Sequence, residues 1–346
     1  MRIVEGPYLT DLLAQPDAVR ATVEVLRAPE AGESLARFIE GAAPARILLT
    51  GMGASLHALH PLLVRLLSRG ADVRLEDTSE LLYYRRRLLA PRTLVIAVSQ
   101  SGESAELVRL ARLRRNGWRM LAVTNSAGST LAARADAAVA LAAGAEHSVS
   151  CKTYVATLAA LAWLGGFLMG KPNRGRQALR DILDAAAAMA AYLSRWRRHT
   201  AALAKQLAEV RYLVLAGRGP SLAAALTGGL ITKEAAHFPA EGMSAAAFRH
   251  GPLEMCGPGT AVFVFEGADK TAELNRGLAR DVRRAGGKVL LIGPAGTGPG
   301  QLPILPERAL PLLEILPVQM ATLALAALAG REAGRFTRAS KVTRTE

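Results

Sequence analysis

Cysteine and aromatic residues are scarce in this sequence, and each scarcity argues against a class of protein. The 346 residues include two cysteines, Cys151 and Cys256, which lie far apart and form no C-x-x-C pattern. We therefore expect neither a disulfide framework nor a zinc knuckle, and a reducing compartment fits best. Aromatic residues make up 5% of the chain, whereas 51% is hydrophobic and 21% is charged. This composition is typical of a compact, helix-rich globular protein.

A membrane-spanning run and an export signal are also missing. The longest uncharged stretch, residues 154–170, falls short of the roughly 20 apolar residues that a membrane-spanning helix needs, so we expect a buried core helix there. The amino terminus, MRIVEGPYLTDLLAQ, is acidic and polar where a signal peptide would be basic and then apolar. We therefore expect a cytoplasmic protein with no membrane partner.

The net charge of +14 would ordinarily indicate a nucleic-acid ligand. Arg85, Arg86 and Arg87 follow two tyrosines, as they would in an RNA-binding patch. The other basic residues, however, are spread over the whole chain, mostly as arginines on helical segments, and no nucleic-acid-binding motif is present. We expect no nucleic-acid partner.

A sequence repeat divides the chain into two similar halves. The repeated pairs are LLTGMGASL (48–56) with VLAGRGPSL (214–222), TLVIAV (93–98) with TAVFVF (260–265), and NGWRMLAV (116–123) with AGGKVLLI (285–292). The pairs keep their order and nearly the same separation, as a duplicated βαβαβ unit would. Short apolar strands that alternate with helical segments are typical of parallel sheets covered on both faces. The predicted fold is therefore α/β, with two doubly wound parallel-sheet domains in tandem.

We expect three parts along the chain. Residues 1–172 form the first domain with its amino-terminal helices, residues 173–210 form a connector, and residues 211–346 form the second domain with a carboxyl-terminal tail. The connector is predicted to contain two helices, because its apolar residues recur at helical spacing.

A serine-rich loop, SQSGES (99–104), follows the strand expected at residues 94–98. A helix is predicted over residues 105–115, and its amino terminus offers unpaired N–H groups to an anion. Gly102 allows close approach of the backbone, and three hydroxyls can donate to phosphate oxygens. Open α/β sheets bind ligands at the carboxyl ends of their strands, where this loop lies. We predict a phosphate site here, with Ser55 adding a hydroxyl from a neighbouring strand end.

These glycine and serine patterns also have other interpretations. The serines would also cap the following helix, with Glu103 supporting the cap, although one serine is enough for that. The second half has EGAD (266–269) at the corresponding place, which would repel an anion, so we expect phosphate in the first half alone. The Gly-x-Gly turns resemble a dinucleotide-binding fingerprint, but Leu56 and Leu222 replace its third glycine.

Taken together, the motifs resemble those of tandem sugar isomerase (SIS) domain proteins, which include the isomerase half of glucosamine-6-phosphate synthase and related sugar-phosphate deaminases. The resemblance covers nearly the whole chain and implies two flavodoxin-like domains. The matching motifs are GAS (53–55), SQSGES (99–104), TN (124–125), GST (128–130), AGAE (143–146) with Val149 and Lys152, GRG (217–219), KE (233–234), AE (240–241), RHGPL (249–253) and SKVT (340–343).

The resemblance implies a role for individual residues. Glu234 would be the base that moves a proton between C1 and C2, which suits a carboxylate whose pKa is brought towards neutrality by burial. His250 would assist ring opening, and Lys341, on a tail folded over the site, would contact substrate hydroxyls and the developing oxyanion. Phosphate and sugar would be bound by Ser55, Ser99, Gln100, Ser101, Ser104, Val149, Ser150 and Ser340.

The resemblance also implies a homodimer with the active site near the subunit interface, where His250 acts either in its own subunit or across the interface. The chain departs from the synthase in lacking a glutaminase domain and a cysteine at position 2, so we expect it not to take ammonia from glutamine. Ile231 stands where the synthase has a lysine, Ala54 replaces a threonine, and the segment 146–152 is one residue shorter.

Our leading hypothesis is a deaminase that converts glucosamine 6-phosphate to fructose 6-phosphate and ammonia. An aldose–ketose isomerase or a fructosamine-phosphate deglycase would use the same base. A non-catalytic sugar-phosphate sensor is the alternative from another class, and it would need the serine loop but not the base, histidine and lysine together. We expect no metal or redox cofactor, because His57 and His60 lie on one predicted helix without a third ligand nearby.

Overall fold

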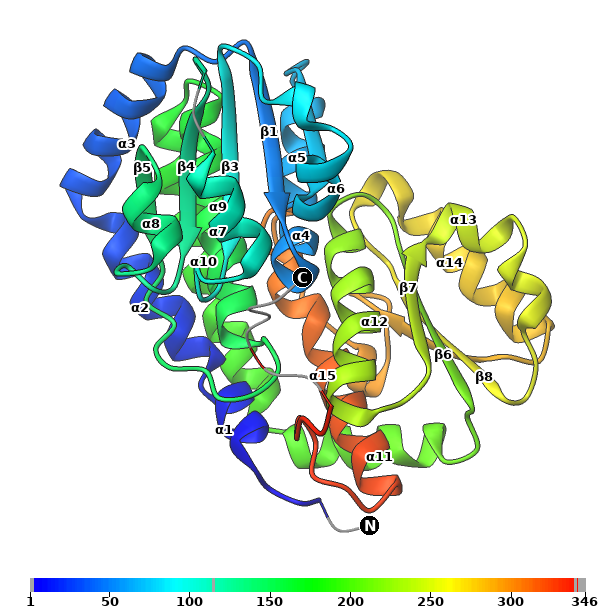
Figure 1. Ribbon diagram of the computed structural model, residues 1–346. Helices are drawn as coiled ribbons and strands as arrows, with labels where there is room; N and C mark the ends of the chain where they lie inside the picture. The colour runs from blue at the N-terminus through cyan, green and yellow to red at the C-terminus, as the bar shows by residue number, and fades with distance from the viewer. Residues whose placement is uncertain (1–2, 114–115, 339–340, 342–346) are drawn as a thin grey trace. The chain divides into compact units, whose positions relative to one another are not determined.

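The structure of the protein is a computed structural model that describes residues 3–113, 116–338 and 341 (Figure 1). Contacts divide the chain into two compact units, each discontinuous in sequence. Unit 1 comprises Met1–Pro16, His147–Ser150 and Asp184–Thr337, and unit 2 comprises Asp17–Glu146, Cys151–Leu183 and Arg338–Glu346. Each unit contains one parallel sheet, so the predicted class of two α/β domains in tandem is confirmed.

The sheet of unit 2 has five parallel strands in the order β2-β1-β3-β4-β5. Its strands are β1 (Arg46–Gly51), β2 (Val73–Asp77), β3 (Thr93–Ser99), β4 (Arg119–Thr124) and β5 (Ala137–Ala140). This is the flavodoxin-like order, in which the direction of winding reverses between β1 and β3. Every residue of β3 is buried, as expected for a central strand of a sheet covered on both faces.

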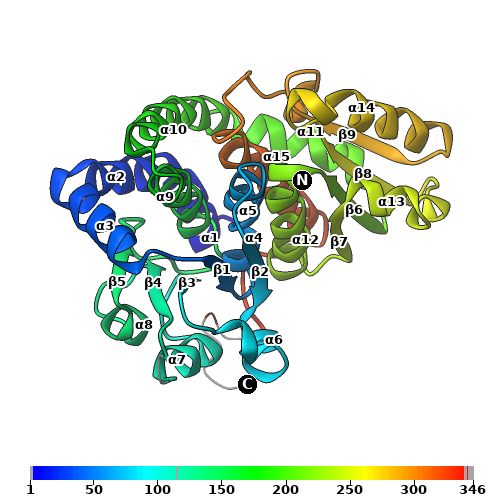
Figure 2. The same ribbon diagram turned by 90° about the horizontal axis from the view of Figure 1, so that it is seen from above.

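Helices cover both faces of this sheet, as Figure 2 shows. The helices of unit 2 are α2 (Gln15–Arg27), α3 (Pro29–Ala42), α4 (Gly53–His57), α5 (His60–Leu67), α6 (Thr78–Tyr83), α7 (Ala105–Arg112), α8 (Thr130–Arg134), α9 (Lys152–Leu168) and the first part of α10 (Pro172–Leu193), with a short 3-10 turn, η1 (Arg86–Leu88). Leu81, Leu107 and Leu131, from α6, α7 and α8, pack with Val95 and Met120 in one core cluster. Helices α3, α5 and α9 lie on the other face.

The sheet of unit 1 has four parallel strands in the order β7-β6-β8-β9, which repeats the arrangement of the first four strands of unit 2. The strands are β6 (Tyr212–Gly217), β7 (Ala240–Ser244), β8 (Thr260–Phe265) and β9 (Lys288–Ile292). The helices are α1 (Pro7–Leu13), α11 (Trp196–Leu207), α12 (Leu222–Ala236), α13 (Ala245–Arg249), α14 (Asp269–Arg284) and α15 (Leu310–Leu328), with 3-10 turns η2 (Gly219–Ser221), η3 (Pro252–Met255) and η4 (Gly298–Gly300).

Two layers of helices enclose the sheet of unit 1. Phe248 of α13 and Leu278 of α14 pack against Val214, Val262 and Val264 of the strands. On the other side, α12 and α11 both contact α15. The sheet is therefore covered by α13 and α14 on one face and by the α11, α12 and α15 layer on the other.

Helix α15 lies in the core of unit 1. It has 19 residues and is, within the described part of the chain, the one helix long and apolar enough to cross a bilayer by length and composition. Its most apolar window is 94% buried inside the structure, as in the core helix of a globular protein. The tyrosine hydroxyl of Tyr8 lies 3.2 Å from the hydroxyl of Thr322, and Gln15 exchanges two hydrogen bonds of 2.9 Å with Gln319.

The repeat predicted from sequence corresponds to equivalent strands in the two units. The three pairs of echoing segments overlap β1 and β6, β3 and β8, and β4 and β9. The connector forms the two predicted helices, α10 and α11, and the uncharged stretch forms the buried helix α9. Two local predictions were wrong: α7 ends at Arg112 instead of continuing to residue 115, and His57 and His60 lie on successive helices, α4 and α5.

Candidate functional site

The serine loop lies at the point of unit 2 where the strand order reverses. Ser99 is the last residue of β3, and Ser55 lies in α4, which directly follows β1. Because β1 and β3 are parallel neighbours, their carboxyl ends lie at the same edge of the sheet. In open α/β sheets, the crevice outside such a pair of strand ends is where ligands bind. The structure thus brings Ser55 and the serine loop to one edge, as predicted.

Backbone geometry gives the loop a defined conformation. Gly102 has φ of +65°, and a Cβ atom added there would lie 2.1 Å from Oγ of Ser129, so only glycine fits. The N–H of Gly102 donates to Oγ of Ser99 at 3.1 Å, and the N–H of Glu103 donates to Oγ of Ser101 at 3.1 Å. Because both hydroxyls accept these bonds, their protons can be donated to an anion.

Capping of α7 does not account for the side chains of Glu103 and Ser104. Ser104 occupies the N-cap position of α7, yet its side chain makes no capping hydrogen bond to any described backbone N–H. Glu103 does not support that cap either. Its carboxylate accepts from the N–H of Thr130 at 2.6 Å and from the Thr130 hydroxyl at 3.0 Å, which caps α8 instead. The hydroxyl of Ser104 therefore remains at a helix amino terminus, where an anion is stabilised.

The carbonyl group of Gln100 fixes the loop to the next strand. It accepts hydrogen bonds from the N–H of Asn125 at 3.2 Å and from the hydroxyl of Thr124 at 3.3 Å, both at the end of β4. The loop is thus held by backbone and side-chain bonds to β4 and α8, which positions its donors before a ligand arrives.

Glu234 lies in the last turn of α12 in unit 1, and its side chain is half-buried. Burial raises the pKa of this carboxyl from 4.5 to about 7, against the opposing effect of neighbouring Lys233. Small residues allow α12 to lie directly on β7: a Cβ atom at Gly229 would come within 2.4 Å of the backbone nitrogen of Gly242. This close packing removes solvent from one side of the helix, including part of its last turn.

His250 immediately follows α13 and is exposed. The chain turns at Gly251, which has φ of +143°, and then enters the 3-10 turn at Pro252. This is the turn that the Gly-Pro pair predicts. The imidazole is therefore presented on the surface of unit 1 by a backbone conformation that requires glycine.

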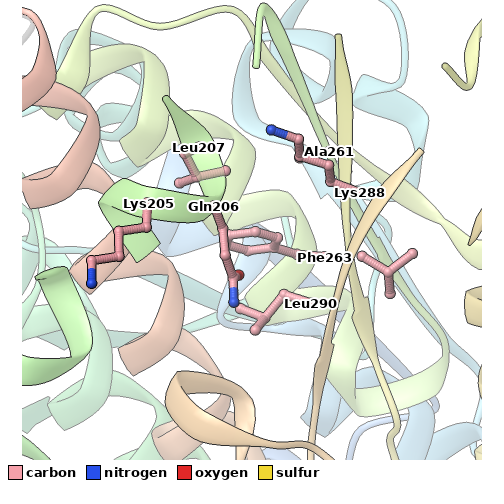
Figure 3. Close-up of a pocket in the computed structure, with 8 residues that line it drawn as sticks. Lys205, Gln206, Leu207, Ala261, Phe263, Lys288 and Leu290 are labelled. Carbon is pink, nitrogen blue, oxygen red and sulfur yellow. The ribbon is translucent and has the colours of Figure 1, made fainter. Parts of the chain in front are cut away.

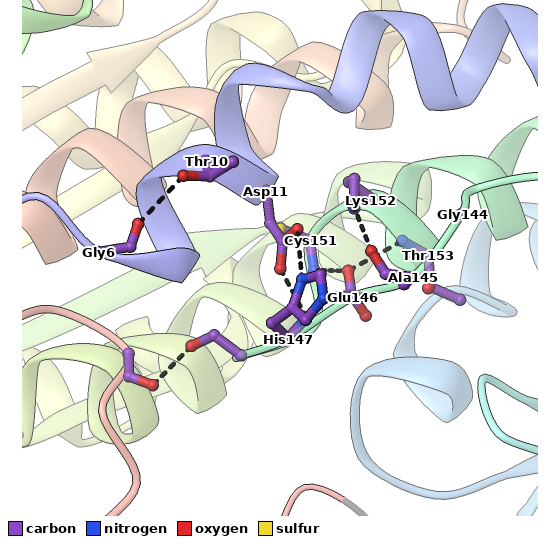
Figure 4. Close-up of polar contacts among 12 residues, drawn as sticks. Gly6, Thr10, Asp11, Gly144, Ala145, Glu146, His147, Cys151, Lys152 and Thr153 are labelled. Atoms are coloured by element: carbon purple, nitrogen blue, oxygen red, sulfur yellow. Dashed lines mark hydrogen bonds and ion pairs between the residues drawn. The ribbon is translucent and has the colours of Figure 1, made fainter.

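The predicted residues Val149 and Ser150 belong to a short segment, His147–Ser150, that the contacts assign to unit 1. Val149 is buried and Ser150 is half-buried. The segment is held at its start, where the N–H of His147 donates to the carboxylate of Asp11 at 2.8 Å (Figure 4). Unit 1 therefore holds Glu234, His250, Val149 and Ser150, and unit 2 holds Ser55, the serine loop and Lys341.

Lys341 contacts a residue that we did not predict as part of the site. Its ammonium group donates to the carbonyl oxygen of Glu146 and lies 3.8 Å from Oε2 of the same residue. The signal was present in the sequence, because Glu146 belongs to the AGAE motif, but nothing local connects that motif to the tail. The neighbouring residue of the tail, Ser340, lies outside the described residues.

The corresponding edge of unit 1 carries buried carboxylates. Glu266, which follows β8, pairs with Arg276 at 3.0 Å and accepts from the N–H of Ala295 at 2.8 Å. Glu314 of α15 is 2% exposed and accepts from the hydroxyl of Ser221 at 2.7 Å. Burial raises the pKa of Glu314 to about 7. Nothing in the sequence marks Glu314, because a single glutamate within an apolar helix belongs to no motif.

A groove in unit 1 lies apart from these residues. Its volume is about 420 Å³, and it is lined by Leu207 at the end of α11, by Phe263 of β8 and by Leu290 of β9, with Lys205 and Lys288 at its margin (Figure 3). None of the predicted site residues lines it. Its lining combines four aliphatic residues with one phenylalanine, one glutamine and two lysines, and it includes no serine, histidine or carboxylate. Among the described residues, no cluster of three or more His, Cys, Asp or Glu side chains is arranged to hold a metal ion.

The SIS domain family matches residues 42–165 and 206–299. Glutamine–fructose-6-phosphate aminotransferase (isomerizing) of Pyrococcus horikoshii is 29% identical over 346 residues, which cover 94% of this chain and 56% of that relative. The chain thus spans little more than half the length of this relative.

Two solved structures share the fold over nearly the whole chain. The carboxyl-terminal domain of glucosamine-fructose-6-phosphate aminotransferase from Francisella tularensis has a TM-score of 0.83 at 19% identity, with 96% of this chain and 98% of that chain covered. Tagatose-6-phosphate ketose/aldose isomerase from Escherichia coli has a TM-score of 0.79 at 21% identity, with 98% and 99% covered.

Proposed function

Because this chain belongs to the SIS domain family, we propose that it binds a phosphorylated sugar and moves a proton between the first two carbons of that sugar. The observation that carries the proposal is the carboxyl group of Glu234, whose pKa is raised to about 7 by burial. A carboxyl group with this pKa exists in both protonation states near neutral pH, so it can accept a proton from one carbon and return it to the other.

The serine loop supplies the phosphate-binding half of the proposal. The hydroxyls of Ser99 and Ser101 are oriented by backbone N–H groups, and that of Ser104 lies at the amino terminus of α7. Ser55 and Gln100 complete the proposed phosphate contacts, and Val149, Ser150 and Ser340 contact the sugar. His250 opens the ring by transferring a proton, and the ammonium group of Lys341 stabilises the oxyanion that develops in the enediol-type intermediate.

The reaction that we propose is conversion of glucosamine 6-phosphate to fructose 6-phosphate and ammonia. Glu234 moves the C2 proton to C1, and water then hydrolyses the resulting imine. An aldose–ketose isomerisation is the second candidate, because it needs the same proton transfer and because the Escherichia coli structure with this fold is named for such a reaction. Deglycation of a fructosamine phosphate and non-catalytic sensing of a sugar phosphate are the remaining alternatives.

A substrate panel tests the reaction. Purified protein is incubated with glucosamine, galactosamine and fructosamine 6-phosphates while ammonia is measured, and glucose and fructose 6-phosphates are tested for interconversion. Ammonia from glucosamine 6-phosphate supports the deaminase, ammonia from the fructosamine phosphate alone supports the deglycase, and interconversion without ammonia supports the isomerase. Tight binding without any turnover would overturn the enzyme assignment in favour of the sensor.

Replacement of the base tests the mechanism. Glu234→Gln removes the proton acceptor but keeps the shape of the side chain, so turnover is lost while sugar-phosphate binding, measured by calorimetry, persists. Glu307→Gln is the matched control, because it makes the same substitution in unit 1 at an exposed residue with no assigned role. Unchanged turnover of Glu234→Gln would refute the role of Glu234 as the base.

We further propose that the protein acts as a homodimer in which His250 serves the partner's substrate. The exposure of His250 at the end of α13 supports this, because an exposed imidazole is available to a second copy. Mixing the Glu234→Gln variant with the His250→Ala variant tests whether His250 acts across the interface. If His250 acts across an interface, hybrid dimers of the two inactive variants contain one intact set of residues and regain activity. If it acts within its own subunit, the mixture stays inactive.

A further inference from the structure

Glu146 links the start of α9 to the carboxyl-terminal tail within unit 2. It lies in the segment between β5 and α9, and its carboxylate is wholly buried. Oε1 accepts hydrogen bonds from the N–H groups of Cys151, at 2.8 Å, and Thr153, at 3.1 Å, both at the amino terminus of α9 (Figure 4). These bonds fasten the carboxylate to the first turn of α9, where the helix dipole favours an acidic side chain.

The other carboxylate oxygen of Glu146 has a single cationic neighbour among the described residues. Oε2 is buried and accepts no hydrogen bond there, but the ammonium nitrogen of Lys341 lies 3.8 Å away. The same ammonium group also donates to the backbone carbonyl of Glu146, and the Lys341 side chain is 24% exposed. A buried carboxylate oxygen without a hydrogen bond is unfavourable unless a positive charge compensates it. Lys341 supplies that charge.

A second lysine, from the start of α9, holds the backbone next to Glu146. Lys152, the first residue of α9, donates from its ammonium group to the carbonyl of Ala145, at 2.5 Å, and is buried. The two consecutive carbonyls of Ala145 and Glu146 thus each accept from a lysine, one close in sequence and one from the tail. The segment 145–146 is thereby held both by the first residue of α9 and by the tail.

We propose that Glu146 is a positioning residue that places the ammonium group of Lys341 for the reaction. The proposal rests on the proposed function, in which Lys341 stabilises a developing oxyanion. Glu146 does not touch the substrate in this scheme. It restrains the Lys341 side chain in the ground state. The side chain therefore loses less conformational entropy when the transition state forms. Its bonds to α9 provide the rigid support.

A double-mutant cycle separates positioning from a structural role. Glu146→Gln keeps an oxygen that can accept from Cys151 and Thr153 but removes the charge that pairs with Lys341. We expect kcat to fall at least tenfold, with KM changed less than threefold. In a Lys341→Met background, Glu146→Gln should have no further effect on kcat, because residues that act through one another are not additive. Two effects that simply multiply, or an unchanged kcat for Glu146→Gln, would overturn the proposal.

Asp77→Asn is the matched control for helix capping. Asp77 also caps a helix of unit 2, since its carboxylate accepts from the N–H groups of Ser79, at 2.8 Å, and Glu80, at 3.3 Å. It has no assigned role in the reaction, so this variant should keep the wild-type kcat. If kcat fell equally in Asp77→Asn and Glu146→Gln, the loss of a helix cap in unit 2 would explain the lower rate, and the position of Lys341 would not.

A second measurement needs no enzymatic activity. Trypsin cleaves after lysine only when the side chain enters the protease, so the contact with Glu146 should protect the bond after Lys341. Mass spectrometry should show several-fold faster cleavage there in Glu146→Gln, while cleavage after Arg37 of α3, which is exposed, stays constant. If the wild type turns over no sugar phosphate but this difference appears, the proposed reaction fails and the contact stands. If turnover is present and cleavage is unchanged, the positioning role fails.

Discussion

Glu314 should make the stability of unit 1 depend on pH, because its carboxyl is buried in the apolar helix α15. The pKa rises from 4.5 to about 7, and the hydroxyl of Ser221 is the partner that limits the rise. The folded pKa lies above the unfolded one, so the stabilisation is present below pH 4.5 and is lost as the pH rises to about 7. At 1.36 kcal/mol per pKa unit, the total loss is about 3 kcal/mol.

The replacement Glu314→Gln removes this dependence while keeping the shape of the side chain and an oxygen that can accept from Ser221. We expect wild type and variant to have similar free energies of unfolding at pH 5. Between pH 5 and pH 8, the wild type should lose about 2–3 kcal/mol relative to the variant. Urea unfolding at the two pH values measures the difference, and the shared contribution of Glu234 cancels in the comparison.

Glu307→Gln is the control, because it makes the same charge change at an exposed position shortly before α15. It should follow the wild type at both pH values. The reasoning would be refuted if Glu314→Gln lost stability in parallel with the wild type, since the carboxyl of Glu314 would then ionise in the folded protein without penalty.

Three further predictions concern the proposed phosphate loop and base. Gly102→Ala should destabilise the protein by about 1–3 kcal/mol and abolish sugar-phosphate binding, because the new Cβ atom clashes with Ser129 at a positive φ. Thermal unfolding measures the loss of stability, and calorimetry measures the loss of binding. Ser104→Ala should weaken sugar-phosphate binding about tenfold in calorimetry without lowering Tm, because its hydroxyl makes no capping bond. The value of kcat/KM should rise with pH through about 7, since Glu234 must be ionised to accept a proton, and a profile that is flat from pH 5 to pH 8 would contradict this.

The parts of the molecule that were predicted correctly are those with a local cause. The buried strands β3 and β8 are continuous apolar runs bounded by residues typical of turns, so their residues alone indicate strands. The repeat then determined that both halves use the same winding, which places Ser55 and the serine loop at one edge of a sheet. Errors arose at helix ends, as with α7 and the His57–His60 segment, where a cap of one or two residues decides the boundary.

The residues that were missed have partners far away in sequence. Glu146 and Lys341 are separated by 195 positions, and no periodicity or motif within either segment predicts that they meet. Glu314 is likewise joined to Ser221 across 93 positions. In both cases the important property is the loss of water around a carboxylate, which depends on the packing of several elements at once.

Glu234 was named as the candidate base only through the family resemblance. The patterns of the sequence by itself determined the class of fold, the repeated strand–helix units and the position of the serine loop. These follow from patterns within segments of about ten residues, and from their repetition. Tertiary structure alone decided which carboxyls are buried, and hence that Glu234 and Glu314 have raised pKa values and that Glu146 is compensated by the tail lysine. The physical reason is that solvation of a charge depends on everything that surrounds it in space, whereas the formation of a strand or helix depends chiefly on its own residues.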